Sequence, residues 1–463
     1  MKVVVSIIFA FSVLLQGCAS GSKSHKDFKL RSYKDLTTKN GMRVLLIKDS
    51  GLPYFTMMML VRTGSVSDPK DKKGLTSMVA GLMSKGTKSM SATEVAESFG
   101  QIGSEFSASV TSDFTLFQAS TLSSHQSELL KNFSEVIVRP VFTQTEVDRY
   151  KKQTLSAFAS ILDDPSSVAS LAIEKYLYET HPYSYSSSGT KDGVVAIKRQ
   201  DIVNHYQKFI RPNNVDLAVV GDFDDDIMMR LEGYFDGWDQ APVSGPVLSS
   251  IPQIDKIQIQ IVDKGDLGQA QIRLAHIGIP RKHPDYLALK VANTILGGGF
   301  ASRLMDEIRI KRGLTYGVSS EFDARRDQGP FIVSTFTRVD KVGDTVKESL
   351  AVIDKFKKDG VTKEEVENAK ALIKGQFPRA LETAELTASN LLQLRYYGVP
   401  DSYLSNFLED IDNISRSDVN RVIQAYFHPD KMKIVVHAPK EKVTDQLNPL
   451  GEASSISYDS VMQ

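Results

Sequence analysis

The amino-acid sequence predicts an α+β fold made of two homologous domains, and the main reason is a long internal repeat. Residues 142–148 (FTQTEVD) correspond to residues 361–367 (VTKEEVE), and residues 201–220 correspond to residues 418–436. The first pair opens a helix with a threonine N-cap and a glutamate three residues later. The second pair leads through a proline-containing loop into a hydrophobic strand. Both pairs occur in the same order at an offset of about 220 residues, which indicates two halves with one fold.

A second reason is that segments with alternating or β-branched residues, typical of strands, are separated by helical patterns. The predicted strands of the first half are 42–48, 55–61, 114–121 and 215–220, and those of the second half are 257–262, 270–276, 315–322, 331–335 and 433–437.

Composition sets the predicted boundaries. We expect an N-terminal domain over 35–240 and a C-terminal domain over 257–447, joined by a linker at 241–256 that contains proline, glycine and serine. The residues at 448–463 are polar and predict a loose tail.

The first residues predict a targeting signal that is not part of the fold. Lys2 precedes an apolar run at 3–15, which is shorter than the roughly 20 residues that span a bilayer. The run ends in LQGC, which resembles a bacterial lipobox. That resemblance implies a signal peptide at 1–17 and lipid attachment to Cys18, and therefore a protein anchored in the bacterial cell envelope.

Cys18 is the only cysteine of the chain, so no disulfide bond can form within it. The alternative for this residue is an inert buried thiol. Ala19 follows, not aspartate, which in envelope lipoproteins goes with delivery to the outer membrane, facing the periplasm. The polar, lysine-rich residues 18–34 predict a flexible tether.

Charge and composition favour no particular polyanionic partner. Lysine plus arginine and aspartate plus glutamate both number 56, so the formal net charge is zero. The hydrophobic share of 41% is that of a soluble globular protein. We therefore expect no nucleic-acid partner.

A predicted helix at 74–84 carries a stripe of small residues. Ser77, Ala80 and Gly81 share one face, opposite an apolar face that packs into the core. A glycine inside a helix costs about 1 kcal/mol relative to alanine, so a packing reason is expected at Gly81. Small residues leave either a cavity or room for another backbone to approach.

In the second half, a glycine-rich segment at 296–304 (LGGGFASRL) leads to Arg309 and Tyr316, seven residues apart. Gly313 is expected to end the intervening helix in a left-handed turn. A strand at 315–322 would then place Arg309 and Tyr316 at one corner. The alternative is a surface arginine and a tyrosine that packs on a strand. Neither G-x-G-x-x-G nor a P-loop lysine is present, which does not favour a nucleotide loop.

Both segments, and their surroundings over about residues 35–445, resemble the pitrilysin/insulysin-type metallopeptidases of the insulinase family, the inverzincins. The helix of that family carries H-x-x-E-H. Here the three motif positions hold Ser77, Ala80 and Gly81, and the position of the remaining glutamate ligand holds Ala157. None of these is a usual zinc ligand or a general base. The resemblance therefore implies that the metal site is lost and that this chain binds no metal.

The resemblance also implies a fold and a role. The expected fold is that of the mitochondrial-processing-peptidase-like metallohydrolases, with mixed or antiparallel sheets flanked by helices, forming half of a clam-shell. In the family the arginine holds substrate carbonyls and the tyrosine donates to the oxyanion, roles that fall on Arg309 and Tyr316. Several bacterial members are two-chain enzymes in which one chain has lost H-x-x-E-H.

The leading hypothesis is therefore a non-catalytic subunit of a heteromeric envelope zinc metalloendopeptidase. Zinc is expected in a partner that carries H-x-x-E-H, and peptides are the expected substrates. One alternative is a scaffold or peptide-binding protein without a catalytic role. The other is a self-sufficient peptidase with an unrecognised metal site.

Overall fold

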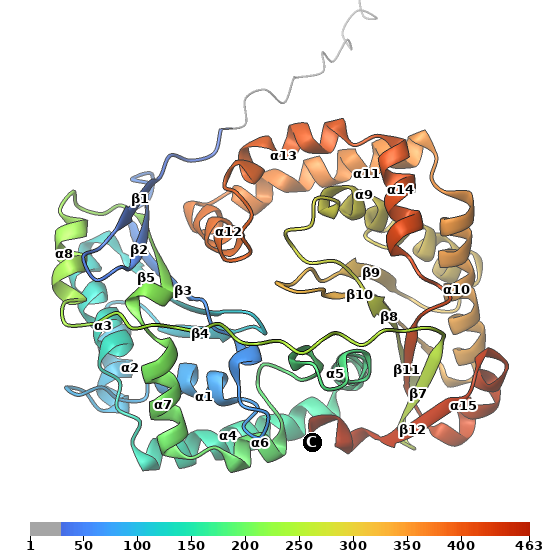
Figure 1. Ribbon diagram of the computed structural model, residues 1–463, viewed down its shortest axis with the longest axis horizontal. Helices are drawn as coiled ribbons and strands as arrows, with labels where there is room; N and C mark the ends of the chain where they lie inside the picture. The colour runs from blue at the N-terminus through green and yellow to red at the C-terminus, as the bar shows by residue number, and fades with distance from the viewer. Residues whose placement is uncertain (1–28) are drawn as a thin grey trace, which may run out of the picture. The chain divides into compact units, whose positions relative to one another are not determined.

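The computed structural model describes residues 29–463, so the predicted signal peptide at 1–17 and the predicted lipidation site Cys18 lie outside the described residues. Residues 31–463 form one compact unit. It contains two six-stranded sheets with helices on their faces (Figure 1). In the described part of the chain, no helix combines the length and apolarity that crossing a membrane requires.

The first sheet uses strands from the first half only. Its strands, in spatial order, are β1 (Lys34–Thr37), β2 (Arg43–Lys48), β6 (Val215–Gly221), β3 (Tyr54–Val61), β5 (Thr115–Leu122) and β4 (Ser107–Val110). β2 and β6 are parallel, and the other pairs are antiparallel. The central strands β6 and β3 are almost wholly buried, because both of their faces are covered.

The second sheet repeats this order. Its strands are β12 (Ala453–Ser457), β7 (Gln258–Asp263), β11 (Lys433–Ala438), β8 (Gln269–Ile277), β10 (Pro330–Arg338) and β9 (Val318–Phe322). β7 is parallel to both β11 and β12, as β2 is to β6. The prediction of two homologous α+β domains with mixed sheets is confirmed.

The helices of the repeat have the predicted caps. α4 (Gln144–Asp163) and α11 (Lys363–Gln376) begin after Thr143 and Thr362, whose side chains accept hydrogen bonds from the backbone three residues on. The remaining α-helices are α1 (Leu75–Leu82), α2 (Ala92–Gly100), α3 (Gln126–Val138), α5 (Pro165–Tyr178), α6 (Lys191–Ala196), α7 (Arg199–Phe209), α8 (Ile227–Tyr234), α9 (Tyr286–Leu296), α10 (Val342–Asp359), α12 (Ala384–Tyr396), α13 (Ser402–Asn413), α14 (Arg416–Tyr426) and α15 (Lys440–Leu447).

The two halves exchange one helix each. α5 belongs to the first half of the sequence but packs on β8 and β11 of the second sheet. α12 holds the equivalent place in the second half and packs on β6 and β3 of the first sheet. Each sheet is thus covered partly by the other half of the chain, which makes the halves interdependent.

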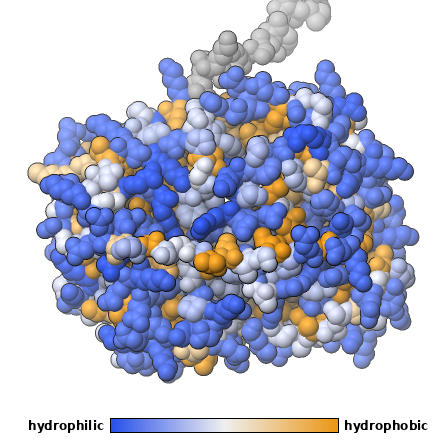
Figure 2. Space-filling view, viewed as in Figure 1, coloured by the Kyte–Doolittle hydropathy of each residue, from blue (hydrophilic) through white to orange (hydrophobic). Residues whose placement is uncertain are grey.

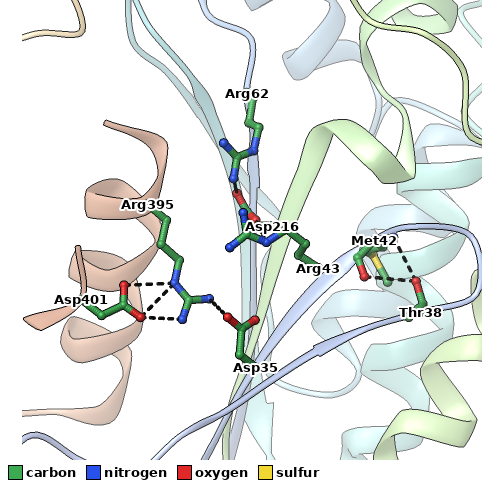
Figure 3. A network of polar contacts seen from close by, with 8 residues as sticks. All are labelled: Asp35, Thr38, Met42, Arg43, Arg62, Asp216, Arg395 and Asp401. Carbon is green, nitrogen blue, oxygen red and sulfur yellow. Dashed lines mark hydrogen bonds and ion pairs between the residues drawn. The ribbon is translucent and has the colours of Figure 1, made fainter. Parts of the chain in front are cut away.

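Ion pairs fix the exchanged helix α12 at the edge of the first sheet (Figure 3). The Arg395 guanidinium lies 2.7 Å from a carboxylate oxygen of Asp401 and 3.2 Å from one of Asp35 in β1. On the adjoining strands, Asp216 of β6 pairs with Arg62 at 2.6 Å. Arg395 and Asp216 are themselves mostly buried, so these pairs are shielded from solvent.

Two expectations about the chain ends are wrong. Residues 448–463 are not loose, because β12 adds to the open edge of β7 and Val461 and Met462 are buried. The expected tether at 18–34 is too long at its C-terminal end. Arg31 donates to the backbone of Leu381, Tyr33 donates to Asp401, and β1 begins at Lys34. In both cases the free backbone N–H and C=O groups of an edge strand pair with a polar segment. The sequence of that segment has no hydrophobic pattern that would predict a strand.

The linker at 241–256 contains no helix or strand. Figure 2 shows a mostly hydrophilic face on which hydrophobic side chains form a broken band across the middle, along the path that this segment follows in Figure 1.

Candidate functional site

The N-terminus of α1 is held by a buried carboxylate. Asp68 accepts hydrogen bonds from the backbone N–H groups of Gly74 at 2.7 Å and Thr76 at 2.8 Å, and from the Thr76 hydroxyl at 2.6 Å. It thereby satisfies N–H groups that the first turn of a helix leaves free. Burial raises the pKa of the Asp68 carboxyl to about 7, against the effect of these hydrogen bonds.

The positions of the expected metal motif are occupied by packed or exposed small residues. The Ser77 hydroxyl donates to the backbone oxygen of Ser187 at 2.6 Å, and Ala80 is buried. At Gly81 the Tyr150 ring from α4 fills the space that a Cβ atom would take. Ala157, also on α4, is exposed. The packing reason expected for Gly81 is confirmed, although the close neighbour is a side chain and not a backbone.

These residues do not fit a zinc ion. Hydroxyl and methyl groups replace the nitrogen and carboxylate donors that zinc prefers, and a longer side chain at position 81 would overlap Tyr150. Within residues 29–463, no group of three or more histidine, cysteine, aspartate or glutamate side chains is arranged to hold a metal.

Arg309 lies on a π-helix, Met305–Lys311, that follows the glycine-rich segment. Gly313 has φ +61°, and Leu314 N donates to Ile308 O at 3.0 Å, so the helix ends in the predicted left-handed turn. Such π-turns often occur at functional sites.

The Arg309 guanidinium is the unpaired cation of this helix. Lys311 pairs with Asp306 at 2.8 Å, and Arg312 pairs with Glu348 at 2.9 Å. In the described structure, Arg309 has no ion pair and its side chain makes no hydrogen bond. Its guanidinium carbon lies 5.6 Å from the centre of the Phe300 ring. Arg309 is half-buried, so its N–H donors can reach a ligand. Removing the remaining water from the guanidinium then costs a moderate free energy.

Tyr316 lies in the turn that follows, and not on the strand predicted at 315–322. The Thr315 hydroxyl accepts from Gly317 N at 3.1 Å and thus closes a local turn, so β9 begins only at Val318. The turn leaves Tyr316 81% exposed. No hydrogen bond of its hydroxyl is present in the described structure.

The structure brings Arg309 and Tyr316 to one cavity of about 570 Å³. The glycine-rich segment, β9 and β10 form most of its wall. Gly297 is required at this wall, because a Cβ atom would overlap Ser320 of β9, whose N–H donates to Gly297 O at 3.0 Å. The exposed Phe300 ring, which sequence reasoning did not single out, also lines the cavity.

Arg273 is a second cavity residue that sequence reasoning missed. It is only 5% exposed, and its five N–H donors reach five neutral oxygens, on Ile272, Thr335, Ser170 and Ser166. Burial lowers the pKa of its guanidinium to about 10. Arg273 therefore ties the N-terminal turn of the exchanged helix α5 to β8. A charged residue in the middle of a hydrophobic strand was the available signal.

Family models match both halves of the chain. Residues 43–191 match the family described as insulinase (peptidase family M16), and residues 196–373 match the M16 peptidase inactive domain. The chain belongs to the M16 peptidase family.

Among the similar proteins is one from Bacillus subtilis described as an uncharacterized zinc protease YmxG, 23% identical over 86% of this chain and 96% of that protein. A relative in Helicobacter pylori is described as the non-peptidase homolog YmxG and is 25% identical over 82% of this chain and 87% of its own length. The crystal structure of a peptidase M16 inactive domain from Pseudomonas fluorescens is 29% identical, with a TM-score of 0.80 over 88% of this chain and 98% of that one.

Proposed function

We propose that this chain is the non-catalytic subunit of a two-chain zinc endopeptidase of the bacterial envelope. One observation carries the proposal. The half-buried guanidinium of Arg309 and the exposed phenol of Tyr316 line one cavity, and neither makes a hydrogen bond or an ion pair in the described structure, whereas Ser77, Ala80 and Gly81 do not fit a metal.

The two side chains suit the binding of an extended peptide. A guanidinium donates several hydrogen bonds in a fixed fork and can hold the carbonyl oxygens of a peptide backbone. The phenol O–H of a residue that lines the same cavity can donate to the oxygen that becomes negative when a peptide carbonyl is attacked. Removing one such donor costs about 3–4 kcal/mol of transition-state stabilisation in enzymes that depend on it.

The partner would be a family member that carries H-x-x-E-H, and the metal would belong to that chain. The match to the inactive domain of the family and the relative described as a non-peptidase homolog support this division between two chains. Substrates would be peptides or unfolded segments.

Co-expression with an H-x-x-E-H family member from the same genome tests the proposal. We expect a co-purifying complex with zinc only in the partner and peptidase activity only in the mixture. Stoichiometric zinc and peptidase activity in this chain alone would contradict it. A stable complex whose activity does not need this chain would instead indicate a scaffold.

Envelope anchoring is a separate part of the proposal and rests on the LQGC sequence that ends at Cys18. The wild-type chain should fractionate with outer membranes and carry a lipid mass at its N-terminus, and Cys18→Ala should carry none. Full release of the wild-type chain by high salt, without any lipid mass, would exclude the anchor.

A further inference from the structure

A second cavity, of about 360 Å³, shares no lining residue with the cavity of Arg309 and Tyr316. It is formed by α9, α11, α12, α13 and the segments that join them. Figure 1 shows α11 and α13 side by side over α9, with α12 at one end of this group. Nothing in the proposed role of Arg309 and Tyr316 makes use of this cavity.

One wall of the cavity is a row of aromatic rings. The rings of Phe377 and Phe407 stack with their centres 4.2 Å apart and an angle of 13° between their planes. Tyr403 meets Phe407 edge-on at 5.7 Å. These rings hold one another in place, and Phe377 and Phe407 are only 7% and 4% exposed, so the part of them that lines the cavity is a narrow preformed apolar wall.

Two cations face the same space. The Arg281 guanidinium lies between two tyrosine rings, 4.0 Å from the centre of Tyr286 and 4.7 Å from that of Tyr403. This arrangement fixes its orientation. Lys290 extends from α9 with its Nζ 5.8 Å from the centre of the Phe407 ring. Although solvent still reaches this side chain, burial and the nearby Arg281 guanidinium lower the pKa of Lys290.

No carboxylate balances these two charges. The cavity lining contains no aspartate or glutamate, and in the described chain neither Arg281 nor Lys290 has an acidic oxygen within 4.0 Å. By contrast, Arg303 of the same domain is paired with Glu365 at 2.7 Å. Two adjacent like charges on an aromatic wall form an arrangement that a bound anion would stabilise.

We propose that this cavity binds a carboxylate carried on an apolar or aromatic body. The carboxylate oxygens would meet Arg281 and Lys290, and the body would lie against the part of the Phe377, Phe407 and Tyr403 rings that lines the cavity. Two sources have this chemistry: the C-terminal residue of a peptide, and a free aromatic acid. The site does not rest on the proposed peptidase function and can be tested on this chain alone.

Titration calorimetry of the purified chain at low ionic strength tests the site. The probes are the peptide acetyl-Gly-Gly-Phe with a free carboxylate, the same peptide as its C-terminal amide, and 3-phenylpropionate. We expect at least one of the two acids to bind at least tenfold more tightly than the amide, since the carboxylate makes the charge-assisted hydrogen bonds. Tighter binding of the peptide acid identifies a peptide C-terminus as the source, and tighter binding of 3-phenylpropionate identifies a free acid.

Two variants tie the binding to the cavity. Lys290→Met removes one charge, and Gln393→Glu adds a carboxylate at an exposed lining position, so each should weaken acid binding at least tenfold. Lys347→Met, on the exposed face of α10, is the matched control and should bind as the wild type does. Equal binding of acid and amide, absence of binding, or wild-type affinity in both cavity variants would overturn the proposal.

Discussion

The Tyr150 ring occupies the space beside Gly81 in which a Cβ atom would lie. The contact joins α4 to α1 at the position to which the family resemblance assigns a zinc-binding histidine. A glycine in mid-helix is unfavourable by itself, and here the ring packed against it accounts for its presence. Any side chain larger than that of glycine at position 81 would therefore have to displace this ring.

The first prediction concerns that contact. Gly81→Ala should gain up to about 1 kcal/mol from helix propensity but lose about 1–3 kcal/mol through overlap with Tyr150. We expect a net loss of about 1 kcal/mol in the free energy of unfolding, measured by urea denaturation. In a Tyr150→Ala background the same change should be stabilising. A stabilising Gly81→Ala in the wild-type background would show that the ring does not fill the site.

A second prediction is that restoring the ligands alone does not restore the metal site. The quadruple variant Ser77→His, Ala80→Glu, Gly81→His and Ala157→Glu supplies the motif, but the imidazole introduced by Gly81→His would have to displace the Tyr150 ring. We expect substoichiometric zinc by elemental analysis, and near-stoichiometric zinc only when Tyr150→Ala is added. Equal zinc content in the two proteins would contradict the steric argument.

Arg273 supports a third prediction, about the exchanged helix α5. Arg273→Met removes three hydrogen bonds to the exposed residues Ser166 and Ser170 at the start of α5, and each such bond contributes about 1 kcal/mol. Unfolding free energy should fall by about 2–3 kcal/mol, and proteolysis within 165–178 should become faster. Arg338→Met, at an exposed site, is the control and should change neither.

Asp68 gives a fourth prediction, on pH dependence. Its pKa is about 7 in the folded chain, above the value of about 4 for an unfolded aspartate. The folded state therefore binds the proton more tightly, and this contribution to stability is complete below about pH 4 and is lost as the pH rises through about 7. Unfolding free energy should fall by about 2–3 kcal/mol between pH 5 and pH 8 from this group.

Urea midpoints from pH 5 to pH 8 measure the effect. Asp68→Asn should flatten the profile, whereas Asp71→Asn, at the exposed neighbouring turn, should leave it as in the wild type. An unchanged slope in Asp68→Asn would exclude the buried carboxyl as its source.

Local signals made much of the fold predictable. The threonine caps at Thr143 and Thr362 and the alternating strands repeat in both halves, so nine of the strands were located to within a few residues. The exchange of α5 and α12 was not predictable, because it depends on which sheet a helix reaches and not on its own pattern. β1, β4 and β12 were missed because they are edge strands with mostly exposed, polar residues.

The part of the candidate site that depends on the spacing of residues along the chain was predictable from the sequence. The interval from Arg309 to Tyr316 and the turn at Gly313 were visible in the sequence, and the structure places both side chains on one cavity. The π-helix and the exposure of Tyr316 were not visible, because they depend on the hydrogen bonds of Thr315 and Leu314. The Tyr150 contact likewise needed the relative placement of α1 and α4.

The central claim is that Arg309 and Tyr316 complete the active site of a metal-carrying partner. The most direct measurement is kcat of the reconstituted two-chain complex with Tyr316→Phe, compared with Tyr234→Phe, which lies outside the cavity. We predict a fall in kcat of roughly 10²- to 10³-fold for Tyr316→Phe, with complex formation intact and no change for the control. A Tyr316→Phe complex with wild-type kcat and KM would contradict the claim.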